Sequence, residues 1–206
     1  MKTNIAPITP VAAIVPIDQF RDKTAFGFWM YLMTDCVLFA SLFATYAVLR
    51  NNTAGGAAGS ELFSLPYVLV ETVLLLTSSL TCGLALLAAK RANNRQVLGW
   101  LAVTFLLGAS FLVMEVSEFA KLAHEGNSWQ RSGFLSGFFT LVGTHGLHIA
   151  SGLLWLLVLS IKIARNKTSG LAGNMLKRLT LFSVFWHLLD IVWIFIFTVV
   201  YLIGAA

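Results

Sequence analysis

Five apolar runs, each long enough to cross a lipid bilayer as a helix, determine what this chain can fold into. A spanning helix needs about 20 mostly apolar residues, because each residue adds about 1.5 Å and the hydrocarbon core is about 30 Å thick. No alternating pattern of a β-barrel competes with these runs. The sequence therefore predicts an all-α membrane protein with five transmembrane helices. Their expected ranges are residues 26–49, 66–89, 97–121, 134–161 and 180–203.

The composition agrees with a chain that lies mostly in lipid. Hydrophobic residues make up 58% of the sequence and charged residues only 11%, whereas soluble domains have about 25% charged residues. We expect residues 1–24 to form an N-terminal cytoplasmic tail and residues 25–206 to form a single transmembrane domain. The tail lacks the basic start and long apolar segment of a secretory signal, so we expect it to be retained. Residues 51–60 predict a flexible polar connector.

Basic residues gather on one side of the predicted helices. They are Lys2, Arg21 and Lys23 in the tail, Lys90, Arg91 and Arg95 in the second connector, and Lys162, Arg165, Lys167, Lys177 and Arg178 in the fourth. The opposite side has only Arg50, Lys121 and Arg131. The positive-inside rule then predicts a cytoplasmic N-terminus and a periplasmic C-terminus. The net charge of +5 is spread over these short segments, which form no long basic face for a nucleic acid.

Ionisable residues inside the predicted spans are the candidates for chemistry or for a scaffold. They are Asp35, Glu71, Glu115, Glu118, His145, His148, His187 and Asp190. Such residues are costly in lipid unless paired or wetted, and they usually face the interior of the bundle. By depth, Asp35, His187 and Asp190 predict one polar layer and the three glutamates a second. His145 and His148, three residues apart, share one face of the fourth helix.

The histidines admit three interpretations. They could bind haem or a metal ion, with Asp190 as a supporting hydrogen-bond partner; they could relay protons; or they could be structural, bonded to buried acids and backbone carbonyls. Helical spacing alone is a weak signal for a metal, and the structural interpretation needs the fewest assumptions. We therefore predict no catalytic residue, no metal ligand and no cofactor-binding residue, but a buried polar framework. Glycines along residues 133–152 allow close helix contact.

Four segments carry a resemblance to a known family. They are GTHGLHIASG at 143–152, FWHLLDIVWIFIFTVVY at 185–201, MEVSEFAKL at 114–122 and MTDCVLFASLF at 33–43. Taken in their order along the chain, they resemble the motifs of subunit III of the haem–copper terminal oxidases. Asp35 stands where that family usually has a carbodiimide-reactive glutamate. The chain lacks the first two of the seven helices of the mitochondrial type, and it is similar to the short form in bacterial quinol oxidases of the cytochrome bo type.

The resemblance implies a role that depends on partners. Subunit III of this family carries no cofactor; haem b, haem o or a, and copper are expected in the partner subunit I. The chain is then expected to pack on subunit I, to work with subunits II and IV, and to bind phospholipid. It would support assembly and sustained proton uptake of a complex that oxidises ubiquinol and reduces oxygen to water. The expected location is the bacterial inner membrane, and the chain would be an enzyme only as a subunit.

Three other functions remain open on the sequence alone. A relative of subunit III serves nitric oxide reductase systems, and copurifying partners would distinguish it. A stand-alone proton channel or transporter would use Asp35, Glu71 and Asp190 as a path, and it would transport protons in liposomes. A membrane metalloenzyme would contain a stoichiometric metal ion.

Overall fold

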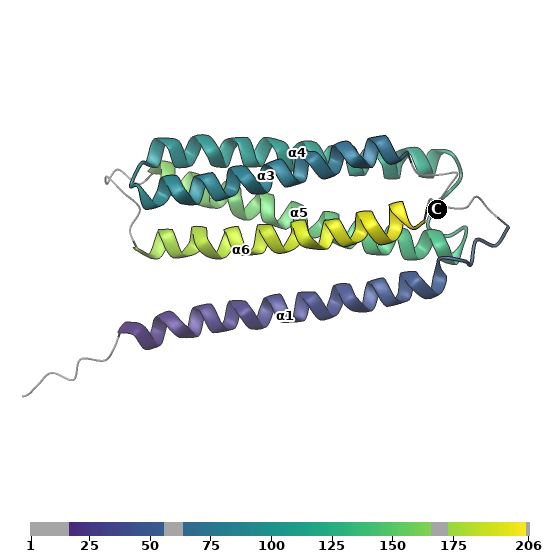
Figure 1. Ribbon diagram of the computed structural model, residues 1–206, viewed down its shortest axis with the longest axis horizontal. Helices are drawn as coiled ribbons and strands as arrows, with labels where there is room; N and C mark the ends of the chain where they lie inside the picture. The colour runs from purple at the N-terminus through teal and green to yellow at the C-terminus, as the bar shows by residue number, and fades with distance from the viewer. Residues whose placement is uncertain (1–16, 56–63, 166–172, 205–206) are drawn as a thin grey trace, which may run out of the picture.

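A computed structural model describes residues 17–55, 64–165 and 173–204 of the chain, with side chains from residue 23 onward (Figure 1). All the regular elements in this part are helical. They are α1 (Ile17–Leu49), α3 (Leu65–Lys90), α4 (Asn94–His124), α5 (Gly133–Arg165), α6 (Gly173–Ile196) and a terminal π-helix, η1 (Phe197–Leu202).

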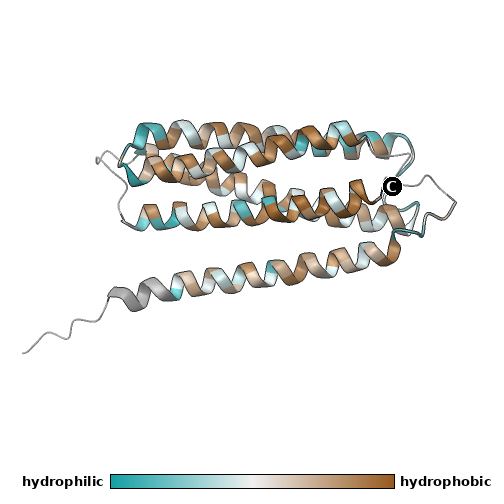
Figure 2. Ribbon diagram, in the orientation of Figure 1, coloured by the Kyte–Doolittle hydropathy of each residue, from teal (hydrophilic) through white to brown (hydrophobic). Residues whose placement is uncertain are grey.

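The five predicted membrane spans are confirmed as helices of sufficient length and apolar character. They cover Lys23–Leu49, Leu65–Lys90, Asn94–His124, Gly133–Arg165 and Gly173–Leu202. Figure 2 shows hydrophilic colour at both ends of α4 and at the left ends of α3 and α6, with mostly apolar residues between and a few polar ones in the middle of α6. This distribution is the one that a bilayer imposes, because polar side chains gain hydration only at the headgroup level.

The observed helix ends differ from the predicted ones mainly at two N-termini. Helix α1 begins at Ile17 and α6 at Gly173, earlier than the predicted residues 26 and 180. An apolar run marks only the part of a helix that lies in lipid, and helix-forming polar residues can continue the helix beyond it. The connector predicted at 51–60 lies partly outside the described residues. Pro66 stands in the first turn of α3, where a helix loses no hydrogen bond through the missing N–H.

Helices α3, α4, α5 and α6 form an antiparallel bundle, and α1 lies along one side of it (Figure 1). Each bundle helix packs against two others, in the order α3, α4, α5, α6 and back to α3. Helix α1 packs mainly on α5 and to a smaller extent on α6. The helices that α1 contacts are therefore the last two in the chain.

Small residues make room for a large ring at the centre of the bundle. The Trp186 side chain on α6 is 1% exposed, and its indole lies against Gly108 of α4 and Gly152 of α5. A Cβ added at Gly108 would be 3.0 Å from the indole, and one added at Gly152 would be 2.9 Å from it. Three helices thus meet around one indole. The predicted role of the α5 glycines in close packing is confirmed at Gly152.

A π-helix replaces the last turns of the fifth span. From Phe197 to Leu202 the backbone is wider than an α-helix, and Ile203 N–H donates to the Thr198 carbonyl at 3.0 Å. Such widened turns occur frequently at functional sites because they redirect side chains. Here Val200 and Tyr201 are both fully buried. The sequence analysis had no signal for this segment, whose composition is that of an ordinary apolar helix.

Candidate functional site

Asp35 and His148 form the polar contact between α1 and α5. His148 Nε2 lies 3.4 Å from Asp35 Oδ1, and His148 Nδ1 lies 2.7 Å from the Thr144 carbonyl oxygen. Asp35 is 6% exposed, and its other oxygen has no hydrogen-bond partner within the described chain. The pairing differs from the sequence-based one, which grouped Asp35 with His187 and Asp190 by depth alone.

The Thr144 carbonyl determines how protons are arranged in this contact. A carbonyl oxygen only accepts, so His148 Nδ1 carries a proton and donates it. A neutral His148 then presents an unprotonated Nε2 to Asp35, and the contact is attractive only if Asp35 carries a proton. A protonated His148 instead pairs with a negative Asp35. The contact at 3.4 Å is therefore a hydrogen bond in which either His148 Nε2 or Asp35 Oδ1 is the donor.

His145 occupies a different environment from His148, although the two belong to one motif. Its ring is fully buried and stacks on Trp193 at a centroid distance of 5.2 Å, with Phe111 edge-on at 5.9 Å. Neither ring nitrogen has a hydrogen-bond partner among the described residues. The structural interpretation of the motif predicted hydrogen bonds for both histidines, and for His145 that prediction is wrong. The faces of α4 and α6 next to His145 carry aromatic side chains, and these enclose its ring.

A series of side-chain hydrogen bonds joins α3 to α6. Trp193 Nε1 donates to Thr72 Oγ1 at 3.0 Å, and Trp186 Nε1 donates to Ser78 Oγ at 3.0 Å. His187 Nδ1 lies 2.9 Å from Ser79 Oγ. The sequence analysis missed these serine and threonine partners. A signal was present, because the two tryptophans are seven residues apart and therefore face the same side of α6.

The prediction that all eight residues of the polar framework are buried is wrong for His187, whose side chain is exposed. Glu118 and His148 are partly buried, and the other five are buried. The buried face of α6 follows Trp186, Leu189, Asp190 and Trp193, so helical rotation places His187 beside that face. Rotation of a helix around its axis cannot be predicted without knowing the neighbouring helices.

The hydrogen bond between His187 and Ser79 should contribute little stability, because polar groups of an unfolded membrane protein also find hydrogen-bond partners. We expect a double-mutant cycle with Ser79→Ala and His187→Leu to give a coupling of about 1 kcal/mol or less in the free energy of unfolding. Denaturant titration of the purified protein would measure it. A coupling of several kcal/mol would contradict this expectation.

The second polar layer gathers three glutamates from two helices. Glu71 on α3 and Glu115 on α4 are 0% and 2% exposed, and Glu118 accepts a hydrogen bond from the Tyr201 hydroxyl at 3.1 Å. Glu71 and Glu118 both interact electrostatically with Glu115. Neither oxygen of Glu71 has a hydrogen-bond partner within the described residues. The three acids thus lie together, as the sequence-based grouping predicted. The Tyr201 hydroxyl, which the π-helix supplies, was not predicted.

Gly146 on α5 makes room for the Glu115 carboxyl group. A Cβ added there would lie 2.5 Å from Glu115 Oε1, whereas a Cβ at Gly143 would lie 3.5 Å from Phe119. We expect Gly146→Ala to lower the free energy of unfolding by about 1 to 3 kcal/mol, because overpacking forces the buried acid to move.

The matched control for that variant is Gly143→Ala on the same helix. It gains helix propensity without a close contact, so we expect unchanged or higher stability. Thermal denaturation of the two variants would measure the difference. Equal melting temperatures would show that Glu115 moves without cost.

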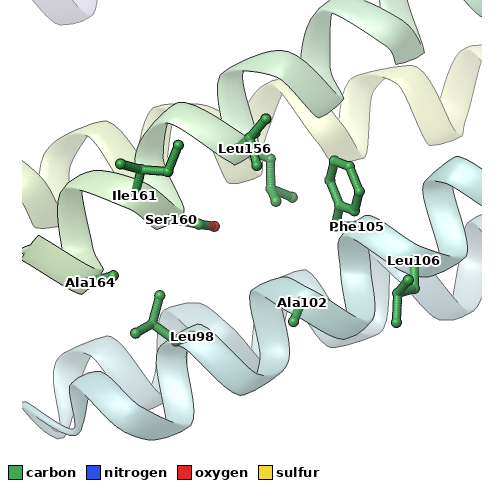
Figure 3. Close-up of a pocket in the computed structure, with 9 residues that line it drawn as sticks. Leu98, Ala102, Phe105, Leu106, Leu156, Ser160, Ile161 and Ala164 are labelled. Carbon is green, nitrogen blue, oxygen red and sulfur yellow. The ribbon is translucent and has the colours of Figure 1, made fainter.

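An apolar groove opens between α4 and α5 toward the end of the bundle that carries Arg165 (Figure 3). Its volume is about 440 Å³, and Ser160 is its only polar lining residue. Figure 3 shows the Ser160 hydroxyl directed into the space between the two helices. Such a groove fits a hydrocarbon chain, and its lining carries one hydroxyl and no charged group.

The chemistry available to the polar groups is limited by their contacts. Both nitrogens of His148 are engaged by Thr144 and Asp35, which leaves neither free to bind a metal ion. Within the described part of the chain, no group of three His, Cys, Asp or Glu side chains could hold a metal ion. The arrangement can hold helices together and can share a proton between Asp35 and His148.

Comparisons with known proteins point to one family. The chain matches the family described as cytochrome c oxidase subunit III over residues 18–205. It is 60% identical over 183 residues to the cytochrome bo(3) ubiquinol oxidase subunit 3 of Pseudomonas aeruginosa, covering 89% of this chain and 86% of that protein. The protein of the same description from Pseudomonas putida is 55% identical, over 88% of this chain and 86% of its own length.

A relative with a different description is also similar. The cytochrome c oxidase subunit 3 of Bacillus sp. (strain PS3) is 49% identical over 178 residues, covering 86% of this chain and 84% of that protein. The resemblance to subunit III of the haem–copper oxidases, which rested on four helix motifs, is thereby confirmed, and so is the assignment as a subunit of an oxidase. Because the family match and these identities extend over most of the chain, the protein belongs to the cytochrome c oxidase subunit III family.

Proposed function

We propose that this chain is subunit III of a cytochrome bo-type ubiquinol oxidase in the bacterial inner membrane. The single observation that carries the proposal is the 60% identity to a cytochrome bo(3) ubiquinol oxidase subunit 3 over 89% of the chain. The complex would oxidise ubiquinol and reduce oxygen to water. This chain would bind no haem or copper itself, because haem b, haem o or a, and copper would belong to subunit I.

The proposed role of the chain is to pack on subunit I, together with subunits II and IV, and to support assembly and sustained proton uptake. The contact between Asp35 and His148 supports this role, since it joins α1 to α5 through two side chains that can exchange a proton. The polar framework supports the structural part of the role by joining helices inside the bundle. Bound phospholipid is part of the proposal, and the apolar groove between α4 and α5 is consistent with it.

The proposed topology places the N-terminus in the cytoplasm and the C-terminus in the periplasm. It is supported by Lys90, Arg91, Arg95, Lys162 and Arg165, which lie at the helix ends on the N-terminal side of the bundle. The opposite side carries fewer basic residues, and the positive-inside rule relates this asymmetry to orientation. Single cysteines introduced at Asn93 and at Ser128 would test it. Only Ser128→Cys should react with an impermeant thiol reagent added to intact cells whose outer membrane is permeable.

The first experiment is to isolate the chain from its native membrane in mild detergent and identify what copurifies. A large multi-span partner, a reduced-minus-oxidised spectrum of haem b with haem o or a, and oxygen uptake with ubiquinol are expected. A colourless chain recovered alone would contradict the proposal and direct attention to transport in liposomes.

A second candidate follows from the 49% identity to a cytochrome c oxidase subunit 3. In that case the electron donor of the complex would be a cytochrome c instead of ubiquinol. Oxygen uptake by the purified complex with each donor distinguishes the two. Activity with reduced cytochrome c and none with ubiquinol would favour the second candidate.

A further inference from the structure

Three carboxyl groups gather between α3 and α4, in the half of the bundle that contains the start of α3. They belong to Glu71, Glu115 and Glu118, and each interacts electrostatically with the other two. Glu71 is 0% exposed and Glu115 is 2% exposed, so bulk water does not screen their charges. Three negative charges together in an apolar bundle would repel one another strongly. The site therefore needs a positive charge or bound protons to be stable.

Glu118 has two partners that stabilise a negative charge. The Tyr201 hydroxyl donates a hydrogen bond to Glu118 Oε2 at 3.1 Å. The Lys121 ammonium group, three residues further along α4, attracts the same carboxyl group. Glu118 is partly buried and Lys121 is exposed. Glu118 is therefore the member of the cluster that carries a negative charge most easily.

Among the described residues, no such partner stabilises a charge on Glu71 or Glu115. Both oxygens of Glu71, and Oε2 of Glu115, lack a hydrogen-bond partner. The Tyr67 hydroxyl, one turn earlier on α3, donates to the Met114 carbonyl at 3.0 Å instead. A buried carboxylate without a donor or a cation is costly, whereas a protonated carboxyl group is neutral. These contacts favour a proton on each of the two side chains.

Helix α5 closes the site without supplying a counter-charge. The Gly146 backbone lies against the Glu115 carboxyl group, because a Cβ added to Gly146 would be 2.5 Å from Glu115 Oε1. His145, the preceding residue, is 0% exposed, and neither of its ring nitrogens has a hydrogen-bond partner within the described chain. A positive charge on this ring would itself be unpaired, so His145 is neutral.

The last span places a neutral group beside the site. Tyr201, in the π-helix, is fully buried and interacts electrostatically with all three glutamates. Asp190 is the acid of this span, and it interacts with Ser79 and His187 instead. In the part of the chain that the structure describes, Lys121 is thus the cation beside the cluster. One lysine balances one of three carboxylates.

We propose that Glu71, Glu115 and Glu118 form a proton-binding site that holds two protons and one negative charge at neutral pH. The protons belong to Glu71 and Glu115, and the charge belongs to Glu118. The site is distinct from the contact between Asp35 and His148, which joins α1 to α5. Binding of the two protons removes the repulsion between α3 and α4. This inference goes beyond the proposed function, because it concerns groups inside this chain.

Infrared spectroscopy of the purified complex tests the proposal, because protonated and ionised carboxyl groups absorb at different frequencies. We expect Glu71→Gln and Glu115→Gln each to remove a band of a protonated carboxyl group at neutral pH. Glu118→Gln should remove a carboxylate band instead. Glutamine has nearly the same shape as glutamic acid and does not ionise, so these variants keep the packing of the site.

Glu125→Gln is the matched control, since Glu125 caps the end of α4 and is exposed. It should remove a carboxylate band only. Glu71→Asp and Glu115→Asp keep an acid on a shorter side chain, so they should shift the band of the protonated carboxyl group without removing it. These two variants carry the test if a glutamine variant does not assemble.

The bound protons also determine how stability depends on pH. An exposed glutamate ionises at about pH 4, so the unfolded chain releases protons that the folded site keeps. The folded state then binds more protons than the unfolded state, and stability falls as the pH rises. Each retained proton should shift the equilibrium about tenfold per pH unit toward the unfolded state. Denaturant titration of the complex at several pH values, followed as loss of this chain, should give a smaller slope for Glu71→Gln than for Glu125→Gln.

The proposal is overturned if Glu71→Gln and Glu115→Gln remove carboxylate bands, or if the two aspartate variants leave the band of the protonated carboxyl group unchanged. An equal pH dependence of stability in Glu71→Gln and Glu125→Gln would overturn it as well. A purified sample without haem would contradict the proposed function and not this site, because the infrared bands come from the chain itself.

Discussion

Replacing Trp186 with alanine is expected to lower the free energy of unfolding by about 3 to 5 kcal/mol, the usual range for loss of a buried aromatic side chain. The indole fills the space between Gly108 and Gly152 and donates a hydrogen bond to Ser78 at 3.0 Å. Glycines cannot close the cavity that remains, because they have no side chains to move into it. The loss should appear as a lower melting temperature and a lower yield of the assembled complex.

A matched control separates this effect from the general loss of a tryptophan. Trp129 is 58% exposed, so Trp129→Ala should leave the melting temperature nearly unchanged. Trp186→Phe keeps most of the ring volume but removes the donor to Ser78, and we expect it to cost about 1 kcal/mol. If Trp186→Ala has the same melting temperature as the unmodified protein, the three-helix contact does not limit the stability of the bundle.

Replacing Asp35 with asparagine should leave assembly intact but make the oxidase lose activity several-fold sooner during turnover. An asparagine amide can donate to His148 Nε2, so the contact at 3.4 Å is kept. The amide cannot take up or release a proton, so proton exchange between this side chain and His148 is lost. Continuous recording of oxygen uptake over many turnovers, with the haem content of the same sample, measures both parts of the prediction.

Two comparisons make the Asp35 result specific. Glu71→Gln changes a buried carboxyl that has no histidine beside it, and we expect its activity to persist as in the unmodified enzyme. Asp35→Leu removes the hydrogen-bond partner of His148 and should also reduce assembly, because an unsatisfied buried group costs about 1 to 3 kcal/mol. Progress curves for Asp35→Asn that match the unmodified enzyme would refute a role for this proton.

Much of the architecture could be predicted from the order and length of the apolar runs. A bilayer requires helices of a certain length, so the five spans were predictable with ends displaced by several residues at α1 and α6. The grouping of Glu71 with Glu115 and Glu118 was also predictable, because connectors on one side place these residues at similar depth. The family was predictable from sequence motifs in four helices. The spacing of the polar residues alone would not have identified it.

The remaining features depend on which helices are neighbours. Depth alone grouped Asp35 with His187 and Asp190, and it is the packing of α1 on α5 that places Asp35 against His148. The exposure of His187 follows from the rotation of α6, which Trp186 and Trp193 determine by bonding to α3. The residues of the π-helix have the composition of an ordinary apolar helix. The sequence therefore gave no reason to expect the Tyr201 hydroxyl beside Glu118.

The position of α1 has a consequence for how the protein is made. Helix α1 is synthesised first, but its packing partners α5 and α6 come last. Asp35 and His148 are separated by 113 residues, and a ribosome needs on the order of 10 seconds to add that many. During this interval Asp35 would lie in a newly inserted helix without its histidine, where an isolated charge costs several kcal/mol. The N-terminal helix therefore waits for α5 with its buried carboxyl unpaired, which favours a second protein beside α1 during insertion.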